Sequence, residues 1–315
     1  MNFKNLQYFL AVAENESITK AAETLYVSQQ ALSNLISKLE KEMDTKLFER
    51  SPRFSLTLAG KCLQKASLQI CGIHSQLLQE VMDINNENRG ELRIGISVTR
   101  SQAILPQVIP VFSATHPLVG IELVEKPFSV LTDALSHGTI DLMFGFSPVL
   151  FEHAESVEIY KERFFLVIPR KITESRYGRM ADKMRARFAK GVTIAAFAEE
   201  PFIMLNASGR IRGMLDNLFR KNGIRPKTVL ETGNIQTAFA LAQRGLGLTV
   251  CPEFYLTSNR SLSGVLGAAD ENPDCFPLPD DEMTQTFVIA YNKERYLSKP
   301  AGDFIRLSCD VLRIG

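Results

Sequence analysis

The sequence predicts an α/β protein built from three successive parts. Two short helical patterns near Ser28 are separated by only a few residues, which is typical of helices that cross steeply in a helix-turn-helix. A proline-free helical stretch then runs from Leu58 to about Glu87. From Glu91 onward, strands alternate with helices, which indicates a parallel sheet covered by helices. The predicted parts are a winged helix-turn-helix (residues 1–60), a linker helix with a hinge (58–89) and a two-lobed α/β domain (90–315).

Three helices are expected in the first part. Apolar residues recur at helical spacing over about residues 3–14. Ser17 can cap a second helix, in which the adjacent Ala21 and Ala22 allow a close crossing. Ser28 is a good N-cap for a third helix. The inward side chains of that helix are Leu32, Leu35, Ile36 and Leu39.

The outward face of the third helix indicates DNA recognition. It carries mostly uncharged amides and hydroxyls, where a solvated helix usually carries Lys and Glu. Amides can form paired hydrogen bonds with adenine, hydroxyls can contact bases or phosphates, and a helix N-terminus favours phosphate. A polar surface helix without a partner is the alternative. The predicted DNA-contacting residues of this helix are Ser28, Gln29, Gln30, Ser33, Asn34 and Lys38.

A hairpin-like wing is expected after the third helix. Short extended pieces at residues 47–50 and 53–56 flank Ser51-Pro52. They carry Arg50 and Arg53, which can reach backbone phosphates or a narrow minor groove. We therefore add both arginines to the predicted DNA-contacting residues.

Residues 5–60 resemble the DNA-binding domain of the LysR-type transcriptional regulators. The matching residues are Leu6-Gln7-Tyr8-Phe9, Ser17, Ala21-Ala22, Leu25, Ser28-Gln29, Ala31, Ser33, Leu39-Glu40, Leu47-Phe48-Glu49-Arg50 and Leu56-Thr57-Leu58-Ala59-Gly60. The resemblance implies a homo-oligomer that reads an interrupted palindrome, with Gln29, Gln30, Ser33 and Asn34 in the major groove and the two wing arginines contacting DNA.

Two departures from the family pattern stand out. Gln30 replaces a frequent proline, which removes a rigid first-turn residue and adds hydrogen-bonding groups at the groove. Met43-Asp44 replaces the usual Leu-Gly, so Asp44 lies where a left-handed C-terminal cap prefers Gly or Asn.

Composition limits the function classes. The chain has 315 residues, 45% hydrophobic and 23% charged, which suits a globular protein of two or three domains. Its net charge is +1, and residues 1–60 hold seven Lys and Arg against seven Asp and Glu. Because this part lacks the basic excess normally expected of a DNA binder, we expect tight binding only when two or more heads engage together.

Several motifs are absent from the sequence. There is no signal peptide and no apolar stretch long enough for a bilayer, so a cytoplasmic location is expected. Five cysteines without a close pair and four histidines without ligand spacing predict no metal, disulfide or cofactor. Thiol-based sensing is only weakly supported. Without a nucleophile elbow or phosphate-binding loop, an enzyme is not expected.

The linker helix carries one apolar stripe. Its residues recur at steps of four, three, four, four and three, as in a coiled coil. This pattern predicts pairing with a second copy of the chain; packing against the chain's own core is the alternative. A two-fold dimer would place two recognition helices about 34 Å apart. The stripe residues are Ala66, Ile70, Ile73, Leu77, Val81 and Ile84, and the hinge is expected at residues 85–90.

The C-terminal part is expected to form two lobes. Strands are predicted at residues 92–96, 120–125, 140–145, 164–168, 193–196, 228–231, 246–250 and 287–291, and helices at 103–115, 130–137, 211–222, 235–243 and 301–312. The pattern resembles the LysR-type effector domain, which is similar to type II periplasmic binding proteins. The matches are Leu92-Arg93-Ile94-Gly95, Leu105-Pro106, His116-Pro117, Gly138 with Ile140-Asp141-Leu142, and Gly245-Leu246-Gly247 with Pro252. The resemblance implies lobe I at about 91–163 and 268–315 and lobe II at about 164–267.

A small-molecule effector is expected between the lobes, beyond the carboxyl ends of the strands. Residues 97–101 follow the first strand and begin a helix, so their hydroxyls and free amides can hold a carboxylate or phosphate. Arg100 favours an anionic effector; plain helix caps and a solvated arginine are the alternative. Residues 128–129, after the second strand, and residues 201–203, in the opposite lobe, are expected on loops that also line this site. The resemblance implies contacts from Thr99, Phe128 or Ser129, Phe202 and Ile203. The predicted effector-binding residues are Ser97, Thr99, Arg100, Phe128, Ser129, Phe202 and Ile203.

Residues 174–190 look longer and more basic than the usual connector of the family. They predict an amphipathic helix with Met180, Met184 and Phe188 inward. A solvated surface helix is the first interpretation, and a second subunit contact or a lid is the alternative.

The function predicted from these patterns is an effector-responsive, DNA-binding regulator. The expected partners are double-stranded DNA, further copies of the chain as a dimer and tetramer, a small-molecule effector and RNA polymerase. Effector binding is expected to respace the DNA-binding heads, and so to change the DNA bend and access for polymerase. A small-molecule binding protein whose N-terminal part serves only for assembly is the alternative.

Overall fold

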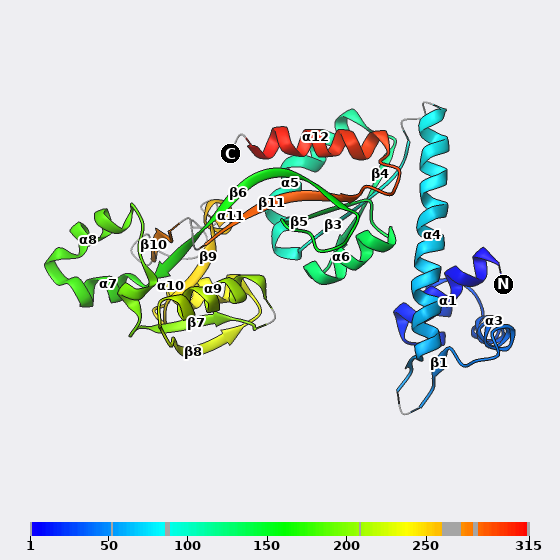
Figure 1. The fold of residues 1–315 in the computed structure, drawn as a ribbon, viewed down its shortest axis with the longest axis horizontal. Coiled ribbons are helices and arrows are strands. Elements are labelled where there is room, and N and C mark those ends of the chain that lie inside the picture. The colour runs from blue at the N-terminus through cyan, green and yellow to red at the C-terminus, as the bar shows by residue number, and fades with distance from the viewer. Residues whose placement is uncertain are drawn as a thin grey trace. The chain divides into compact units, whose positions relative to one another are not determined.

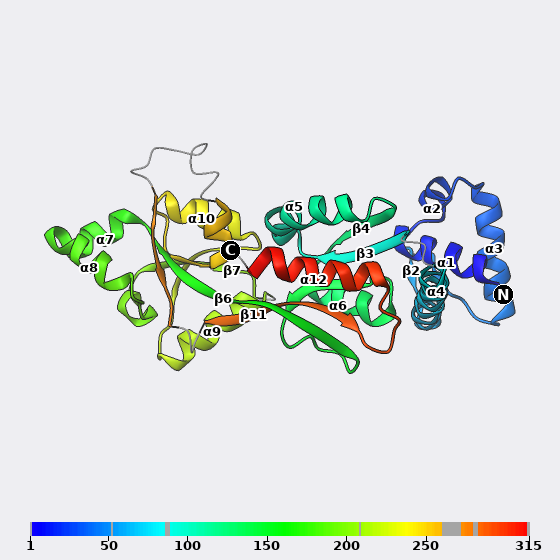
Figure 2. The same cartoon turned by 90° about the horizontal axis from the view of Figure 1, so that it is seen from above.

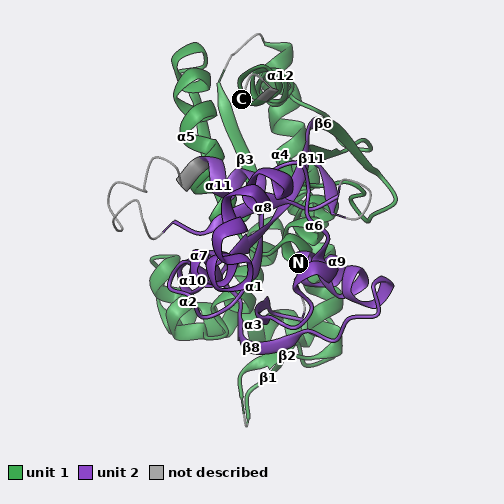
Figure 3. Ribbon diagram, turned by 90° about the vertical axis from the view of Figure 1, so that its left-hand side faces the viewer, with its two compact units in different colours: residues 1–158, 288–315 green, residues 159–287 purple. Residues whose placement is uncertain are grey.

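A computed structural model of the chain describes residues 2–51, 53–85, 89–207, 209–259, 272–279 and 283–313. The chain forms two compact units, coloured separately in Figure 3: unit 1 is residues 1–158 and 288–315, and unit 2 is residues 159–287. The predicted lobe limits put the two connections between the lobes near residues 163 and 267. Residue 267 lies outside the described ranges. The predicted domain limits therefore stay predictions.

The N-terminal residues of unit 1 form a winged helix-turn-helix. Its elements are α1 (Phe3–Asn15), α2 (Ile18–Thr24), α3 (Gln29–Glu42), β1 (Phe48–Glu49) and β2 (Ser55–Leu56). The predicted caps are confirmed, because Ser17 Oγ accepts a hydrogen bond from Lys20 N–H and Ser28 Oγ accepts one from Ala31 N–H. Phe9, Leu32 and Ile36 are fully buried together in the core.

The linker is one long helix, α4 (Leu58–Ile84), visible in cyan in Figure 1. Thr57 begins it by accepting a hydrogen bond from Gly60 N–H at 2.9 Å. A Cβ at Gly60 would lie 2.1 Å from the carbonyl oxygen of Leu47, so glycine permits the close approach of the helix start to the strand β1 region. The helix ends at Ile84, with Asn85 as its C-cap.

The remainder of unit 1 is an α/β layer structure. β3 (Gly90–Ile96) pairs in parallel with both β4 (Val119–Glu125) and β5 (Leu142–Phe146). The carboxyl ends of the three strands therefore lie at one edge. Figures 1 and 2 show α5 (Val98–Thr115) and α12 (Lys299–Arg313) on one face of this sheet and α6 (Phe128–His137) on the other.

Unit 2 is built around two strands that continue from unit 1, β6 (Ala154–Ile168) and β11 (Thr284–Asn292). β9 (Thr249–Pro252) and β10 (Asp274–Pro277) pair with β6, and β7 (Pro201–Leu205) pairs in parallel with β8 (Lys227–Thr232). Its helices are α7 (Arg170–Tyr177), α8 (Ala181–Phe188), α9 (Arg210–Lys221), α10 (Ile235–Gln243) and α11 (Glu253–Asn259), with 3₁₀ turns η1 (Gly178–Met180) and η2 (Ile194–Phe197).

The structure corrects several sequence predictions in this unit. The sheet is mixed rather than parallel, because β9 and β10 run antiparallel to β6. The strand predicted at 193–196 is the 3₁₀ turn η2, in which Ile194 and Phe197 are both buried at a spacing of three, where a strand would bury alternate residues. The single helix predicted over 174–190 is interrupted at Gly178, whose φ of +48° favours glycine.

Candidate nucleic-acid interface and effector site

The predicted DNA-contacting residues of α3 gather on its outer face. Gln29, Gln30, Asn34 and Lys38 are exposed, and Ser33 is half-buried. Gln30, Asn34 and Lys38 follow one another at spacings of four, which places them on one side of the helix. Ser28 is exposed and is already used as the helix cap. The opposite side of α3 is buried in the core.

Tyr26 is a candidate contact that sequence reasoning missed. It lies in the turn between α2 and α3, its side chain is 96% exposed, and its φ is +54°. A bulky residue with positive φ is an outlier, and the ring stands in solvent beside the start of α3. The available signal was a large aromatic residue two positions before the helix cap.

The end of α3 is closed by a left-handed cap. Asp44 has a φ of +46°. Its N–H donates to the carbonyl of Lys41, and the N–H of Thr45 donates to the carbonyl of Glu40 at 3.0 Å. These two bonds define a Schellman motif, in which glycine is usual at the position of Asp44. The departure noted in the sequence therefore places an aspartate in a conformation that favours glycine.

Glu40 connects α3 to the wing and received no role from the sequence. Its side chain is only 5% exposed, and Oε1 accepts hydrogen bonds from the N–H groups of Leu47 at 3.0 Å and Phe48 at 3.4 Å. Lys46 Nζ lies 3.3 Å from Oε2. This buried carboxylate therefore fixes the start of β1 relative to the recognition helix.

The wing arginines point to solvent and touch carboxylates. β1 and β2 form the predicted hairpin, with Glu49 opposite Ser55. Arg50 Nη2 lies 3.7 Å from Glu40 Oε2, and Arg53 Nη2 lies 2.9 Å from Glu16 Oε2. The Arg53 side chain is 81% exposed. Because an exposed ion pair such as Arg53–Glu16 contributes only about 0–1 kcal/mol, a phosphate can replace the Glu16 carboxylate at low cost.

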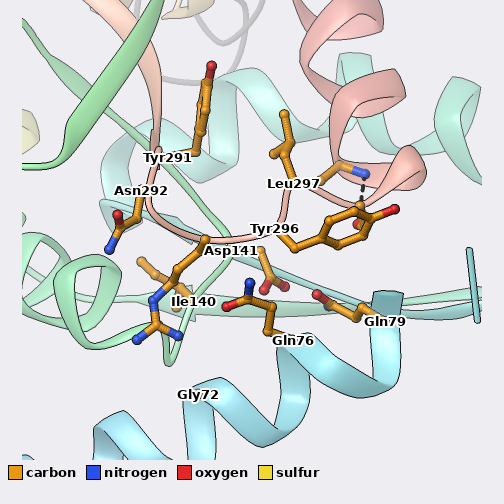
Figure 4. Close-up of a pocket in the computed structure, with 13 residues that line it drawn as sticks. Gly72, Gln76, Gln79, Ile140, Asp141, Tyr291, Asn292, Tyr296 and Leu297 are labelled. Carbon is orange, nitrogen blue, oxygen red and sulfur yellow. Dashed lines mark hydrogen bonds between the residues drawn. The ribbon is translucent and has the colours of Figure 1, made fainter. Parts of the chain in front are cut away.

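One face of α4 is docked on the rest of unit 1 through polar groups (Figure 4). Asp83 is buried, and its Oδ2 accepts hydrogen bonds from the Tyr296 hydroxyl at 2.9 Å and the Lys299 N–H at 2.8 Å. Burial, and next the hydrogen bond to Asp83, raise the pKa of Tyr296. Gly72 allows close approach, since a Cβ there would lie 2.6 Å from Arg295 Nη1. A polar cavity of about 30 Å³ beside these groups has room for an ordered water.

Asp141 lines the same cavity. Burial raises the pKa of its carboxyl, although a hydrogen bond from the Arg93 N–H, the Arg93 charge and Gln79 act to lower it. The Arg93 N–H lies 2.8 Å from Asp141 Oδ2. This carboxyl therefore joins β3 to the start of β5.

The predicted apolar stripe of α4 lies on a different part of the helix and faces solvent. Ile73 is 61% exposed, Leu77 56% and Ile84 72%. The remaining stripe residues, Ala66, Ile70 and Val81, are exposed as well. Burial of this stripe in the chain's own core, which was the alternative interpretation, does not occur in this structure.

The carboxyl edge of β3, β4 and β5 gathers four of the predicted effector residues. Arg100 is buried in the first turn of α5, and its guanidinium carbon lies 4.5 Å from the Phe146 ring centre at the end of β5. The Phe128 ring lies 6.4 Å from the same ring. Ser97 is the N-cap of α5 without a side-chain capping bond, and Thr99 is half-buried beside it.

Two further residues lie at this edge. Ser101 belongs to the predicted stretch 97–101 but not to the predicted binding set, and Phe146 was missed by sequence reasoning. Ser101 donates a short hydrogen bond to the carboxylate of Glu125, at the end of β4. Phe146 lies within reach of both Arg100 and Phe128. Ser129 is exposed. The edge thus combines one buried cation, two aromatic rings, hydroxyls at a helix start and the carboxylate of Glu125, which Ser101 contacts.

Phe202 and Ile203 are placed differently from the expectation. They lie inside strand β7 rather than on a loop, with exposures of 0% and 1%. Phe202 packs edge-on against Phe219, with 5.1 Å between the two ring centres. Ile203 packs in the apolar cluster that contains Val167. Both side chains therefore belong to the core of unit 2, because apolar residues in a strand covered on both faces are buried.

Other kinds of site are not built within the described ranges. No group of three His, Cys, Asp or Glu side chains there could hold a metal ion. Among the described helices, none has the length and apolar character needed to cross a bilayer. Cys251 is buried, and burial raises the pKa of its thiol well above the ordinary value.

Comparison with protein families identifies both parts of the chain. Residues 3–61 match the bacterial regulatory helix-turn-helix protein of the lysR family, and residues 85–313 match the LysR substrate binding domain. The chain belongs to the LysR family. It is therefore a DNA-binding transcriptional regulator with a helix-turn-helix and an effector-binding domain, and not an enzyme.

Individual relatives span nearly the same length. An uncharacterised HTH-type regulator of Bacillus subtilis, YcgK, is 28% identical over 325 residues and covers 99% of this chain and 95% of its own. The regulator ClcR of Pseudomonas putida is 31% identical over 258 residues, which are 80% of this chain and 83% of ClcR. Among solved structures, CbnR in complex with its target DNA has a TM-score of 0.64 at 20% identity, covering 98% and 100%. These likenesses confirm the predicted fold class.

Proposed function

We propose that this LysR-family regulator acts as a homo-oligomer that reads an interrupted palindrome through α3 and responds to a small anionic effector. The observation that carries the DNA part is the outer face of α3, where exposed amides lie at a helix N-terminus. Such amides can form paired hydrogen bonds with adenine. The wing arginines and Lys38 hold the backbone, which positions α3 without reading sequence.

Paired substitutions test the role of α3. Gln29→Ala with Asn34→Ala removes two amides, each contributing about 1–3 kcal/mol of base discrimination if it forms a paired contact. We expect the full chain to lose selection of its preferred site from a random duplex pool while keeping weak, salt-sensitive binding. Gln69→Ala, an exposed amide on α4, is the control. Unchanged site selection by the double variant would contradict the proposal.

The exposed stripe of α4 supports a dimer through this helix. Apolar side chains at steps of three and four residues form a coiled-coil seam when a second helix covers them, and unusually large exposed apolar patches mark interaction sites. Ile73→Glu with Leu77→Glu should yield monomers by sedimentation, because two charges then face the partner helix. Both residues are exposed in the single chain, so its fold should persist. Sedimentation of the variant as the wild-type oligomer would contradict the α4 seam.

The edge around Arg100 supports an anionic effector. A buried guanidinium at a helix N-terminus, flanked by hydroxyls, suits a carboxylate or phosphate, and Phe128 and Phe146 offer flat apolar surface beside it. That the effector also contacts the second lobe stays a prediction. A thermal-shift screen of small mono- and dicarboxylic acids should find a ligand that stabilises the protein by about 2.7 kcal/mol at 100 times its Kd. Thr99→Val should weaken that shift.

The response is proposed to act through the oligomer. Effector binding to one conformation shifts the population toward it, which would change the spacing of the heads, the DNA bend and contact with RNA polymerase. Hydroxyl-radical footprints with and without the screened acid should differ in length or periodicity. Identical footprints at saturating acid would contradict this step.

A further inference from the structure

Positive charge is distributed unevenly along the chain. Residues 170–190 contain eight Lys and Arg against two Asp and Glu, a net charge of +6. The whole chain carries only +1, so the other residues hold 28 Lys and Arg against 33 Asp and Glu. The first sixty residues, which include the recognition helix, are neutral overall. The excess positive charge of this DNA-binding protein therefore lies in the helical segment α7–η1–α8 of unit 2.

The inner side of α8 is held by apolar contacts, and the positive charge of its arginine is balanced by carboxylates. Met184 and Phe188 pack against the core of unit 2. Arg185 Nε lies 3.0 Å from both carboxylate oxygens of Asp274, and its other nitrogens lie 2.9 Å from Asp182 and 3.3 Å from Glu174. Figure 2 shows α7 and α8 side by side in this segment. The helix is thus held in place by apolar contacts and by one arginine with three carboxylates.

The outer side of the segment from η1 through the end of α8 carries cations that no carboxylate of the described residues compensates. Arg179, Lys183, Arg187 and Lys190, which we name the basic stripe, follow one another at spacings of four, four and three residues. All four side chains are exposed. Within the described part of the chain, none of them forms an ion pair or hydrogen bond through its side chain. Arg179 lies in η1, Lys183 and Arg187 lie in α8, and Lys190 lies in the turn that follows α8. Within α8, the two cations four residues apart share one helix face, with about 6 Å of rise between them.

Such a stripe weakens the helix that carries it. Like charges four residues apart destabilise a helix by about 0.2–0.5 kcal/mol per pair. A solvated helix commonly relieves this repulsion by alternating positive and negative side chains. In α8 the carboxylate of Asp182 pairs with Arg185 on the inner side and so does not pair with the stripe. A polyanion would turn the same repulsion into attraction.

We propose that the basic stripe is a second DNA-contacting surface, which binds backbone phosphates outside the segment read by α3. The proposal rests on the DNA-binding function and goes beyond it. DNA is favoured over an acidic protein because the head that reads DNA is neutral and its wing arginines already contact Glu40 and Glu16. Phosphate contacts add affinity and orientation, not sequence preference.

The test compares two variants of the full chain with equal charge change. The stripe variant carries Arg179→Gln, Lys183→Gln, Arg187→Gln and Lys190→Gln. The control carries Arg220→Gln, Lys221→Gln, Arg225→Gln and Lys227→Gln, at exposed cations elsewhere in unit 2. Each binds two duplexes selected from a random pool by the wild-type chain, one long and one trimmed to the footprint of the heads. Binding is measured against KCl concentration, and melting temperatures confirm that both variants fold.

We expect a change in salt dependence only for the stripe variant on the long duplex. On the long duplex, the stripe variant should lower the slope of log affinity against log salt by about 0.9 for each phosphate that the stripe no longer neutralises, up to about 3.6 per protomer. The control variant, and both variants on the trimmed duplex, should match the wild type. An unchanged slope for the stripe variant would overturn the proposal, as would equal decreases for both variants, which net charge alone would explain. Retained binding to the trimmed duplex keeps the role of α3 separate from this outcome.

Discussion

The helices α3 and α8 solve two different problems of DNA binding with opposite surface chemistry. Both bury an apolar side and present a polar side to solvent. The first turns of the outer face of α3 carry amides and hydroxyls, and its cations, Lys38 and Lys41, come only toward its end. The outer side of the η1–α8 segment instead carries the four cations of the basic stripe. Amides can distinguish base edges, while cations attract phosphates of any sequence.

This difference suggests a division of labour between the two units. A neutral recognition helix avoids strong binding to unrelated DNA, which a basic helix would promote, because nonspecific affinity is electrostatic. Affinity then has to come from a separate surface or from joining several heads, and both routes raise effective concentration. The basic stripe and the apolar stripe of α4 fit these two routes.

The largest effect is expected when the α3 and α8 changes are combined. Gln29→Ala and Asn34→Ala together with the four stripe substitutions should cost the sum of the separate decreases in binding free energy, within about 0.5 kcal/mol, because sites without shared partners act additively. Binding to the long selected duplex at fixed salt measures all three variants. A combined decrease well below the sum would show that both changes act on one step, and the two helices would then not be independent surfaces.

Glu40 tests whether the α3 surface depends on the wing. Glu40→Ala leaves the N–H groups of Leu47 and Phe48 without their acceptor, which should destabilise the N-terminal domain by about 3 kcal/mol. Glu40→Gln keeps an amide oxygen as acceptor and should cost clearly less. Urea unfolding of the two variants beside the wild type separates these effects. Equal destabilisation would mean that charge, and not the hydrogen bonds to β1, accounts for the buried carboxylate.

The two helices also show what a sequence can predict. The caps Ser17 and Ser28 and the inner face of α3 follow from local spacing, so they were predicted correctly. The structure of β7 and η2 depends on which neighbours cover them, and spacing alone assigned Phe202 to a loop and residues 193–196 to a strand. The roles of Glu40 and Arg185 depend on partners outside their own helices. Glu40 accepts hydrogen bonds at the start of β1, and Arg185 pairs with Asp274, which is far away in the sequence. No short sequence pattern predicts such contacts.

Arg185 tests how firmly the inner side of α8 is held. Arg185→Gln removes the partner of Asp274, whose side chain is only 12% exposed. Hydrogen bonds to charged groups contribute about 1.5–3 kcal/mol, and the partly exposed arginine reduces this, so destabilisation by about 1–2 kcal/mol is expected. Hydrogen exchange should rise in α7 and α8 and stay unchanged in α3. Unchanged exchange in α8 would show that Met184 and Phe188 hold the helix by themselves.

The smallest expected effect concerns the end of α3 and has the opposite sign. Asp44→Gly should stabilise the N-terminal domain by about 0.5 kcal/mol, because relief of the left-handed backbone, roughly 1 kcal/mol, is offset in part by the greater freedom of glycine in the unfolded chain. Asp44→Ala is the matched control: it removes the same charge from the helix C-terminus, where an anion is unfavourable, but keeps a Cβ at a φ of +46°. Chemical denaturation should therefore rank glycine above aspartate and alanine. Equal stabilisation by alanine would assign the gain to the helix dipole, and the left-handed cap would then impose no measurable strain on Asp44.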